Sequence, residues 1–136
     1  MGLPPLIEAL RSRPGMFVNP QTLDVITAFL RGYDAALYGG LLIGFREWLI
    51  VRSDGGNNLA WEALARDLLG KNLLGDEMKA IEMLFGLLEE FTNARDMPDG
   101  LRRIYMNYER WLREQEWYTP QSPQWIAFDI SRAGHE

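Results

Sequence analysis

Apolar residues recur every three to four positions along most of this chain, which is the spacing of one face of an α-helix. Turn-forming residues interrupt the pattern at Pro14-Gly15, Gly39-Gly40 and Ser53–Asn58. The pattern therefore predicts five or six helices. Their expected ranges are 5–13, 20–38, 42–52, 59–69, 76–94 and a last helix that starts near residue 99.

Three of these helices have a recognisable start signal. Asn19 is a suitable N-cap, and Pro20 suits the first helical position. Asp76 offers an acceptor to the free N–H groups of the fifth helix, and the segment 96–99 is expected to start the sixth.

The fifth helix is apolar over most of its circumference, which is typical of a central helix. Its expected buried residues are Met78, Ile81, Leu84, Phe85, Leu88 and Phe91. Alternating residues of the strand type occur only at 125–130, and one short strand would have nothing to pair with. We therefore expect an all-α fold.

We expect residues 1–136 to form one compact helical bundle, because this length fits a single domain. The 47% apolar content is sufficient for a hydrophobic core. Residues 119–136 are expected to form an irregular, extended tail that packs on the bundle, with Trp125 and Phe128 as anchors.

Composition also indicates the cellular compartment in which the protein is expected. The chain has no cysteine, no basic stretch leading into an apolar one at its start, and no apolar run of roughly 18 residues. These features predict a cytoplasmic protein that does not span a membrane.

The net charge of −5 is unevenly distributed along the chain. Residues 1–75 carry seven basic and seven acidic groups, whereas residues 76–136 carry seven basic and twelve acidic groups. An acidic chain is a poor candidate for nucleic-acid binding, because phosphate contacts supply most of that affinity. The acidic half suits solubility or docking on a basic partner.

Residues that would support catalysis are scarce. His135 is the only histidine and is the penultimate residue, so neither a catalytic triad nor a histidine-rich metal site is expected. Ser53–Asn58 lacks the Lys-Ser or Lys-Thr of a phosphate-binding loop. We predict no catalytic residues, no metal site and no cofactor.

The carboxylates of the fifth helix are the alternative candidates for a catalytic or metal-binding site. Glu82, Glu89 and Glu90 share one polar side of this helix, and paired carboxylates can act as acid and base or bind a metal. The preferred interpretation is a solvated polar face, because these residues keep the helix amphipathic.

The sixth helix carries a second set of residues that suits an interface. These residues step by three or four and are Arg103, Met106, Arg110, Arg113 and Trp117. Arg and Trp are frequent interface hot spots, and such a set would fit a partly acidic partner. Alternatively, the arginines pair with Glu109, Glu114 and Glu116, and Trp117 folds back over the core with Tyr118.

Arg11 and Arg13 form a smaller cationic pair beside the Pro14-Gly15 turn. They are candidates for binding a phosphate or carboxylate ligand, although such residues also pair with acidic side chains of the same fold.

Residues 11–68 resemble small uncharacterised bacterial helical proteins that begin Arg-Pro-x-Met-Tyr and continue with Phe-Leu-x-Gly-Tyr and a Trp-bearing helix. The matching segments here are 13–17, 29–33 and 45–49, followed by Trp61. Phe17 stands where those proteins have Tyr, and Asn19 stands in place of Gly. Some of them look like immunity proteins of toxin systems, so the resemblance implies a toxin-neutralising role.

We therefore expect a non-catalytic cytosolic module whose partner is another protein, acting by steric occlusion with help from attraction between the acidic half and a basic target. The alternatives are a small ligand- or metal-binding protein or enzyme, and a structural homo-oligomer joined through the sixth helix.

Overall fold

The computed structural model describes residues 2–70 and 75–118, and in these ranges the fold is all-α. The α-helices are α1 Pro5–Ser12, α2 Leu23–Ala36, α3 Phe45–Ser53, α4 Trp61–Leu69, α5 Glu77–Arg95 and α6 Gly100–Arg113, with a 3₁₀ turn, η1, at Pro14–Met16. The predicted tail 119–136, with Trp125 and Phe128, lies outside the described residues.

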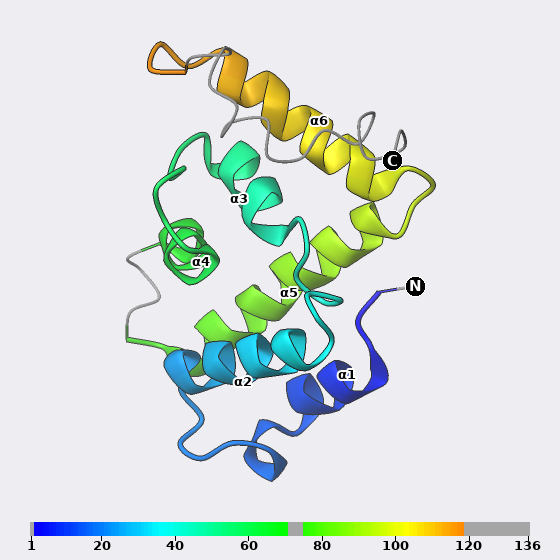
Figure 1. Ribbon diagram of the computed structural model, residues 1–136. Coiled ribbons are helices and arrows are strands. Elements are labelled where there is room, and N and C mark those ends of the chain that lie inside the picture. The colour runs from blue at the N-terminus through cyan, green and yellow to red at the C-terminus, as the bar shows by residue number, and fades with distance from the viewer. Residues whose placement is uncertain (1, 71–74, 119–136) are drawn as a thin grey trace.

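Helix α5 occupies the centre of the bundle, as its apolar circumference predicted. Figure 1 shows it running between α1 and α2 on one side and α3 and α6 on the other, and it also contacts α4. Its residues Ile81, Leu84, Phe85, Leu88 and Phe91 are buried. The prediction for Met78 was wrong: its side chain is 55% exposed, because it lies in the first turn, before α5 enters the core.

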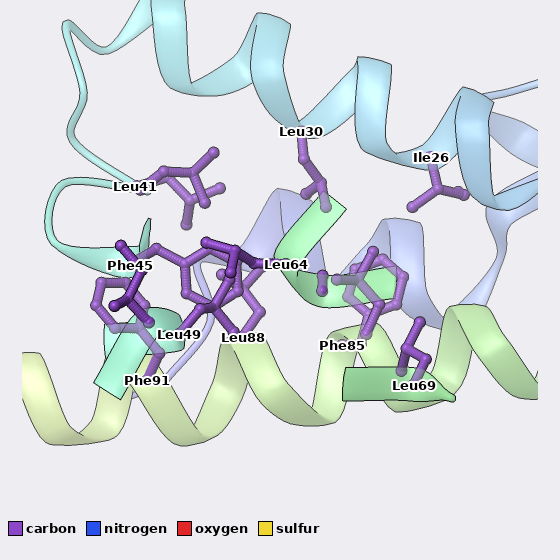
Figure 2. Close-up of a cluster of buried hydrophobic side chains, with 14 of the residues drawn as sticks. Ile26, Leu30, Leu41, Phe45, Leu49, Leu64, Leu69, Phe85, Leu88 and Phe91 are labelled. Carbon is purple, nitrogen blue, oxygen red and sulfur yellow. The ribbon is translucent and has the colours of Figure 1, made fainter. Parts of the chain in front are cut away.

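The core is built from aliphatic and aromatic side chains of α2, α3 and α4 that point toward α5 (Figure 2). Ile26 and Leu30 of α2 are fully buried, as are Leu49 of α3 and Phe85 of α5. Because each such side chain contributes roughly 1.5–3 kcal/mol when removed from water, burial on α5 is the main source of stability.

An aromatic cluster joins α3 to α4 and α5. The ring of Phe45 lies 5.0 Å from that of Phe91, 5.6 Å from Trp61 and 6.1 Å from Trp48, measured between centroids. Phe45 is fully buried, whereas Trp48 and Trp61 are half-buried at the edge. These contacts are within the range at which aromatic pairs attract each other.

Helix α2 begins three residues later than the Asn19-Pro20 signal predicted. Its N-cap is Thr22, whose hydroxyl accepts a hydrogen bond from the Val25 N–H, and the Asn19-Pro20 peptide bond before it is cis. The Leu23 N–H donates to Glu77 Oε2 of α5 at 2.8 Å. Thr22 and Glu77 together accept hydrogen bonds from free N–H groups in the first turn of α2. The start of this helix is therefore set partly by a residue far away in the chain.

Other boundaries also differ from the predicted ones. Leu59 lies in a turn, and α4 starts at Trp61. Helix α2 ends at Ala36, before Gly39-Gly40. Helix α6 starts at Gly100, and Asp99 before it has a positive φ of 59° and makes no side-chain cap. Asp76, in contrast, caps α5 as predicted, accepting from the Lys79 N–H at 3.0 Å.

Candidate interaction surface

Helix α6 packs one side against α3 and α5 and leaves the other side exposed. Its buried residues include Ile104, Trp111 and Leu112. The opposite side carries the α6 face, which we define as Arg102, Arg103, Met106, Arg110 and Arg113, all exposed. The set predicted from sequence did not include Arg102. Tyr105 and Tyr108 are only half-buried whereas Ile104 is buried, so the buried side centres on Ile104 and Arg102 lies on the exposed face.

Most arginines of the α6 face make no ion pair with the residues that the structure describes. Within the described residues Arg102 and Arg103 make no ion pair, and Arg110 reaches only the Asn107 amide oxygen at 3.5 Å. Arg113 pairs with Glu109 one turn earlier, at 3.0 Å. The alternative pairing with Glu114 and Glu116 is not formed. Between its two ends helix α6 contains four arginines and one glutamate, with Asp99 and Glu114 immediately outside these ends.

Trp117 does not belong to the helical set in which it was predicted, because α6 ends at Arg113. It lies in the turn that follows, with 52% of its surface exposed. Its ring meets Trp111 edge to face, with centroids 6.1 Å apart. Tyr118 is the residue that turns inward, since its side chain is buried. An indole that is half exposed beside a cationic helix is typical of interface residues.

A cavity of about 480 Å³ opens beside Trp117. It lies between the end of α6 and the loop after α3, and its lining residues are Asp54, Gly55, Gly56, Asn57, Asn58, Trp111, Gln115 and Trp117. Two indoles supply apolar wall, and the amides and Asp54 supply polar groups. Polar groups therefore line this open cavity as much as the two indoles do.

The loop that forms one wall of this cavity is fixed by hydrogen bonds from α3 and α6. The Trp111 Nε1–H donates to Asp54 Oδ1 at 2.7 Å, and the Tyr108 hydroxyl donates to Asn57 Oδ1. The Arg46 guanidinium donates to the backbone oxygens of Asn57 and Leu59. The loop was interpreted from sequence as a simple turn, and these contacts attach it to both α3 and α6.

Two tyrosines of α6 stay protonated well above neutral pH. Burial, reinforced by the nearby Glu47 carboxylate, raises the pKa of Tyr105 to about 12. Burial also raises the pKa of Tyr108, and the neighbouring Arg46 opposes this shift. The Tyr108 hydroxyl therefore remains a hydrogen-bond donor to the loop throughout the physiological range.

The two other candidate sites of the sequence analysis meet each other in the fold. Arg11 of α1 donates through Nη2 to Glu82 Oε1 of α5 at 2.6 Å, and its Nη1 lies 3.5 Å from Glu89 Oε1. The hydrogen bond from Arg11 to Glu82 is the main cause that raises the pKa of Arg11. Arg11 is therefore surrounded by the carboxylates of Glu8, Glu82 and Glu89 and is not left to bind an anionic ligand.

Arg13 is separate from this network. It is exposed and makes no ion pair with the described residues. A single exposed guanidinium without converging donors is a weak ligand site.

The parts of the chain that the structure describes contain no group of three or more His, Cys, Asp or Glu side chains arranged to hold a metal ion. Among the same residues, no helix combines the length and the apolar character that crossing a bilayer requires.

Comparisons with known proteins leave the chain without an assigned family, because no family model, no curated protein and no solved structure matches it. The resemblance to small bacterial helical proteins therefore stays a prediction.

Proposed function

We propose that this protein is a non-catalytic protein-binding module whose α6 face, together with Trp117, docks on an acidic surface of a partner protein. The observation that carries the proposal is the grouping of half-exposed Met106 and Trp117 with arginines of which, within the described residues, only Arg113 makes an ion pair. Exposing Met and Trp to water has a cost that a partner would remove, and Arg, Trp and Met are enriched at interfaces.

The cavity beside Trp117 extends the proposed interface. Its rigid loop and its two indoles make it suitable as a socket for an apolar or amide-bearing side chain of the partner. A preformed socket lowers the entropy lost on binding, and a central anchor of this kind supplies most of the energy of a typical interface.

Electrostatics support an acidic target for α6. Between Gly100 and Arg113 the helix carries a net charge of +3, from four arginines and one glutamate, and Arg102 and Arg103 make no ion pair within the described residues. Attraction of this kind speeds association and weakens as salt is added. The expectation of a basic target referred to the acidic half of the chain as a whole. The exposed arginines of α6 favour an acidic partner surface instead.

A toxin-neutralising, immunity-type role in the cytoplasm is the specific form of this proposal. It is supported by the resemblance of residues 11–68 and by the absence of cysteine from the chain. Such a protein acts by covering a partner surface, so it needs no reactive group. An enzyme that uses the α5 carboxylates is less well supported, because Arg11 occupies Glu82 and Glu89.

The test begins with affinity capture from host lysate and continues with titration of the purified partner by calorimetry. The double charge reversal Arg103→Glu/Arg110→Glu is expected to weaken binding by about 100-fold or more, because attraction is replaced by repulsion at two positions. Wild-type affinity should fall as salt rises from 50 to 500 mM.

Lys79→Glu/Arg13→Glu is the matched control, since it also reverses two positive charges at exposed positions, on α5 and just after α1. It should leave the affinity within about twofold of the wild type. Equal losses of affinity in both variants would mean that the change in net charge alone weakens binding. That result would reject the α6 face as the binding surface. Unchanged binding after Arg103→Glu/Arg110→Glu would reject it as well.

A further inference from the structure

The cavity between the end of α6 and the loop after α3 has one charged group in its lining. Among the described residues that line it, Asp54 alone carries a charge. Its Oδ1 accepts from the Trp111 Nε1–H at 2.7 Å, and it makes no ion pair within the described part of the chain. Because an indole N–H is a neutral donor, the negative charge of Asp54 is not balanced by this hydrogen bond.

Two further carboxylates follow α6 on the same side of the chain order. Glu114 and Glu116 stand on either side of Gln115, which lines the cavity. Both are exposed, and neither makes an ion pair with the described residues. Carboxylates around a concave site raise the local concentration of cations.

The arginines that precede this segment reach back along α6. Arg113 pairs with Glu109 at 3.0 Å, and Arg110 lies 3.5 Å from the Asn107 amide oxygen. Their guanidinium groups are therefore engaged toward the start of the helix and do not balance Asp54. A cation suits the cavity better than an anion does.

Two indoles form the apolar part of the lining. The rings of Trp111 and Trp117 have centroids 6.1 Å apart and planes inclined by 63°, and Trp117 is 52% exposed. Tyr108 stacks on Trp111 at 6.3 Å and fixes its ring. The face of an aromatic ring attracts cations, and the indole of Trp does so most strongly. The hydrogen bond to the Asp54 carboxylate polarises the Trp111 ring further in this direction.

We propose that this cavity binds a small organic cation with an alkylated ammonium head group, which contacts the two indoles and whose charge is balanced by Asp54. The cavity volume of about 480 Å³ lies in the range of small-molecule sites. An alkylated ammonium group attracts ring faces and a carboxylate without needing hydrogen bonds of fixed direction, so it suits an open cavity. The ligand needs no protein partner, so the proposal does not rest on the proposed function, although ligand and partner side chain would compete for this space.

Titration of the full chain with choline, followed by ¹H–¹⁵N NMR of the indole N–H signals, tests the proposal. Choline carries a permanent positive charge, and 3,3-dimethylbutan-1-ol is its neutral counterpart of the same shape. Choline should shift the Trp111 and Trp117 signals with a dissociation constant of roughly 0.1–5 mM, because so small a ligand makes few contacts. The neutral alcohol should bind at least about 10-fold more weakly, since it lacks the attraction to the rings and to Asp54.

Asp54→Asn removes the charge but keeps an oxygen that can accept from Trp111, and it should weaken choline binding by about 5- to 20-fold. Trp117→Leu removes one ring at a half-exposed position and should weaken binding by about 5-fold. Asp99→Asn is the matched control, because Asp99 is exposed, has a φ of 59° close to the 55° of Asp54, and does not line the cavity. It should bind choline within about twofold of the wild type.

Three results would each overturn the proposal. The first is the absence of any shift of the Trp111 and Trp117 signals up to about 20 mM choline. The second is equal affinity for the neutral alcohol, which would mean that the cavity takes up apolar groups without regard to charge. The third is an Asp54→Asn protein that binds like the wild type or like Asp99→Asn. All of these measurements use the chain alone, so a failure to find a protein partner for the α6 face would leave them unchanged.

Discussion

Gly100 and Gly86 show how differently two helical glycines are constrained. A Cβ at Gly100 would lie 2.3 Å from the carbonyl oxygens of Ala94 and Arg95, so the start of α6 passes directly over the end of α5. A Cβ at Gly86, in the middle of α5, would have nothing within 4 Å. The first glycine is required for the close approach, and the second only makes the helix backbone more flexible.

We expect Gly100→Ala to lower the free energy of unfolding by about 3 kcal/mol, because backbone atoms cannot move away as a flexible side chain can. Gly86→Ala should raise it by about 0.5–1 kcal/mol, the difference in helix propensity. Urea denaturation of both variants measures the effects. A Gly100→Ala protein as stable as the wild type would contradict the close approach of α6 to α5.

Tyr105 gives a prediction for alkaline pH. Its folded-state pKa of about 12 lies above the ordinary value of 10.0, because burial and the Glu47 carboxylate disfavour the phenolate. Its contribution to stability is therefore complete below pH 10 and is lost as the pH rises toward 12, where the unfolded chain has released a proton that the folded chain keeps.

Absorbance titration at 295 nm should show a tyrosine that ionises at about pH 12, and Tyr105→Phe should remove that step. The variant should also lose less stability than the wild type between pH 10 and 11.5. An unchanged titration curve in Tyr105→Phe would assign the late step to another tyrosine.

At the scale of elements, the start of α2 depends on a residue of α5. The Leu23 N–H has its acceptor in Glu77, whose negative charge also lies favourably at the N-terminus of α2. Local sequence alone suggested Asn19 and Pro20 as the start. Thr22 and Glu77 together provide the acceptors that the first turn needs.

Glu77→Ala should therefore lower the free energy of unfolding by about 1 kcal/mol, the typical value for loss of a cap. Glu77→Gln keeps a hydrogen-bond acceptor, so its free energy of unfolding should fall by less. Glu114→Ala is the control, because Glu114 is exposed and makes no ion pair within the described residues. Thermal unfolding followed by circular dichroism distinguishes these outcomes, and an equal effect of Glu77→Ala and Glu114→Ala would reject the long-range cap.

At the scale of the whole molecule, α1 is attached to the bundle by two kinds of contact. Ile7 and Leu10 are fully buried, and Arg11 binds Glu82 and Glu89. The Glu82 and Glu89 side chains are 60% and 45% exposed, so water and salt weaken the ion pair. Burial should therefore contribute more than charge to holding α1.

Leu10→Ala is expected to cost about 2–4 kcal/mol and Arg11→Met about 1 kcal/mol or less. Arg13→Met, at an exposed position without an ion pair in the described part of the chain, should change stability by less than about 0.5 kcal/mol. Denaturant titrations measure the free energy of unfolding of the three variants and so rank these losses. A larger loss from Arg11→Met than from Leu10→Ala would mean that the ion pair, and not the apolar contact, holds α1.

The sequence by itself determined the all-α class of the described residues, a total of five or six helices and the central place of α5. These follow from local spacing, because a 3.6-residue period and turn residues act over a few positions. It also located Arg103, Met106, Arg110 and Arg113 on one exposed side of α6. Whether that side binds a partner stays a prediction.

Only the tertiary structure decided which distant residues meet. It paired Arg11 with Glu82, supplied the Glu77 cap to α2 and brought the loop after α3 against Trp111 and Trp117 to form a cavity. It also placed Tyr38 in a left-handed turn with its ring in water. These features depend on packing between elements far apart in the chain, and helical periodicity contains no information about that packing.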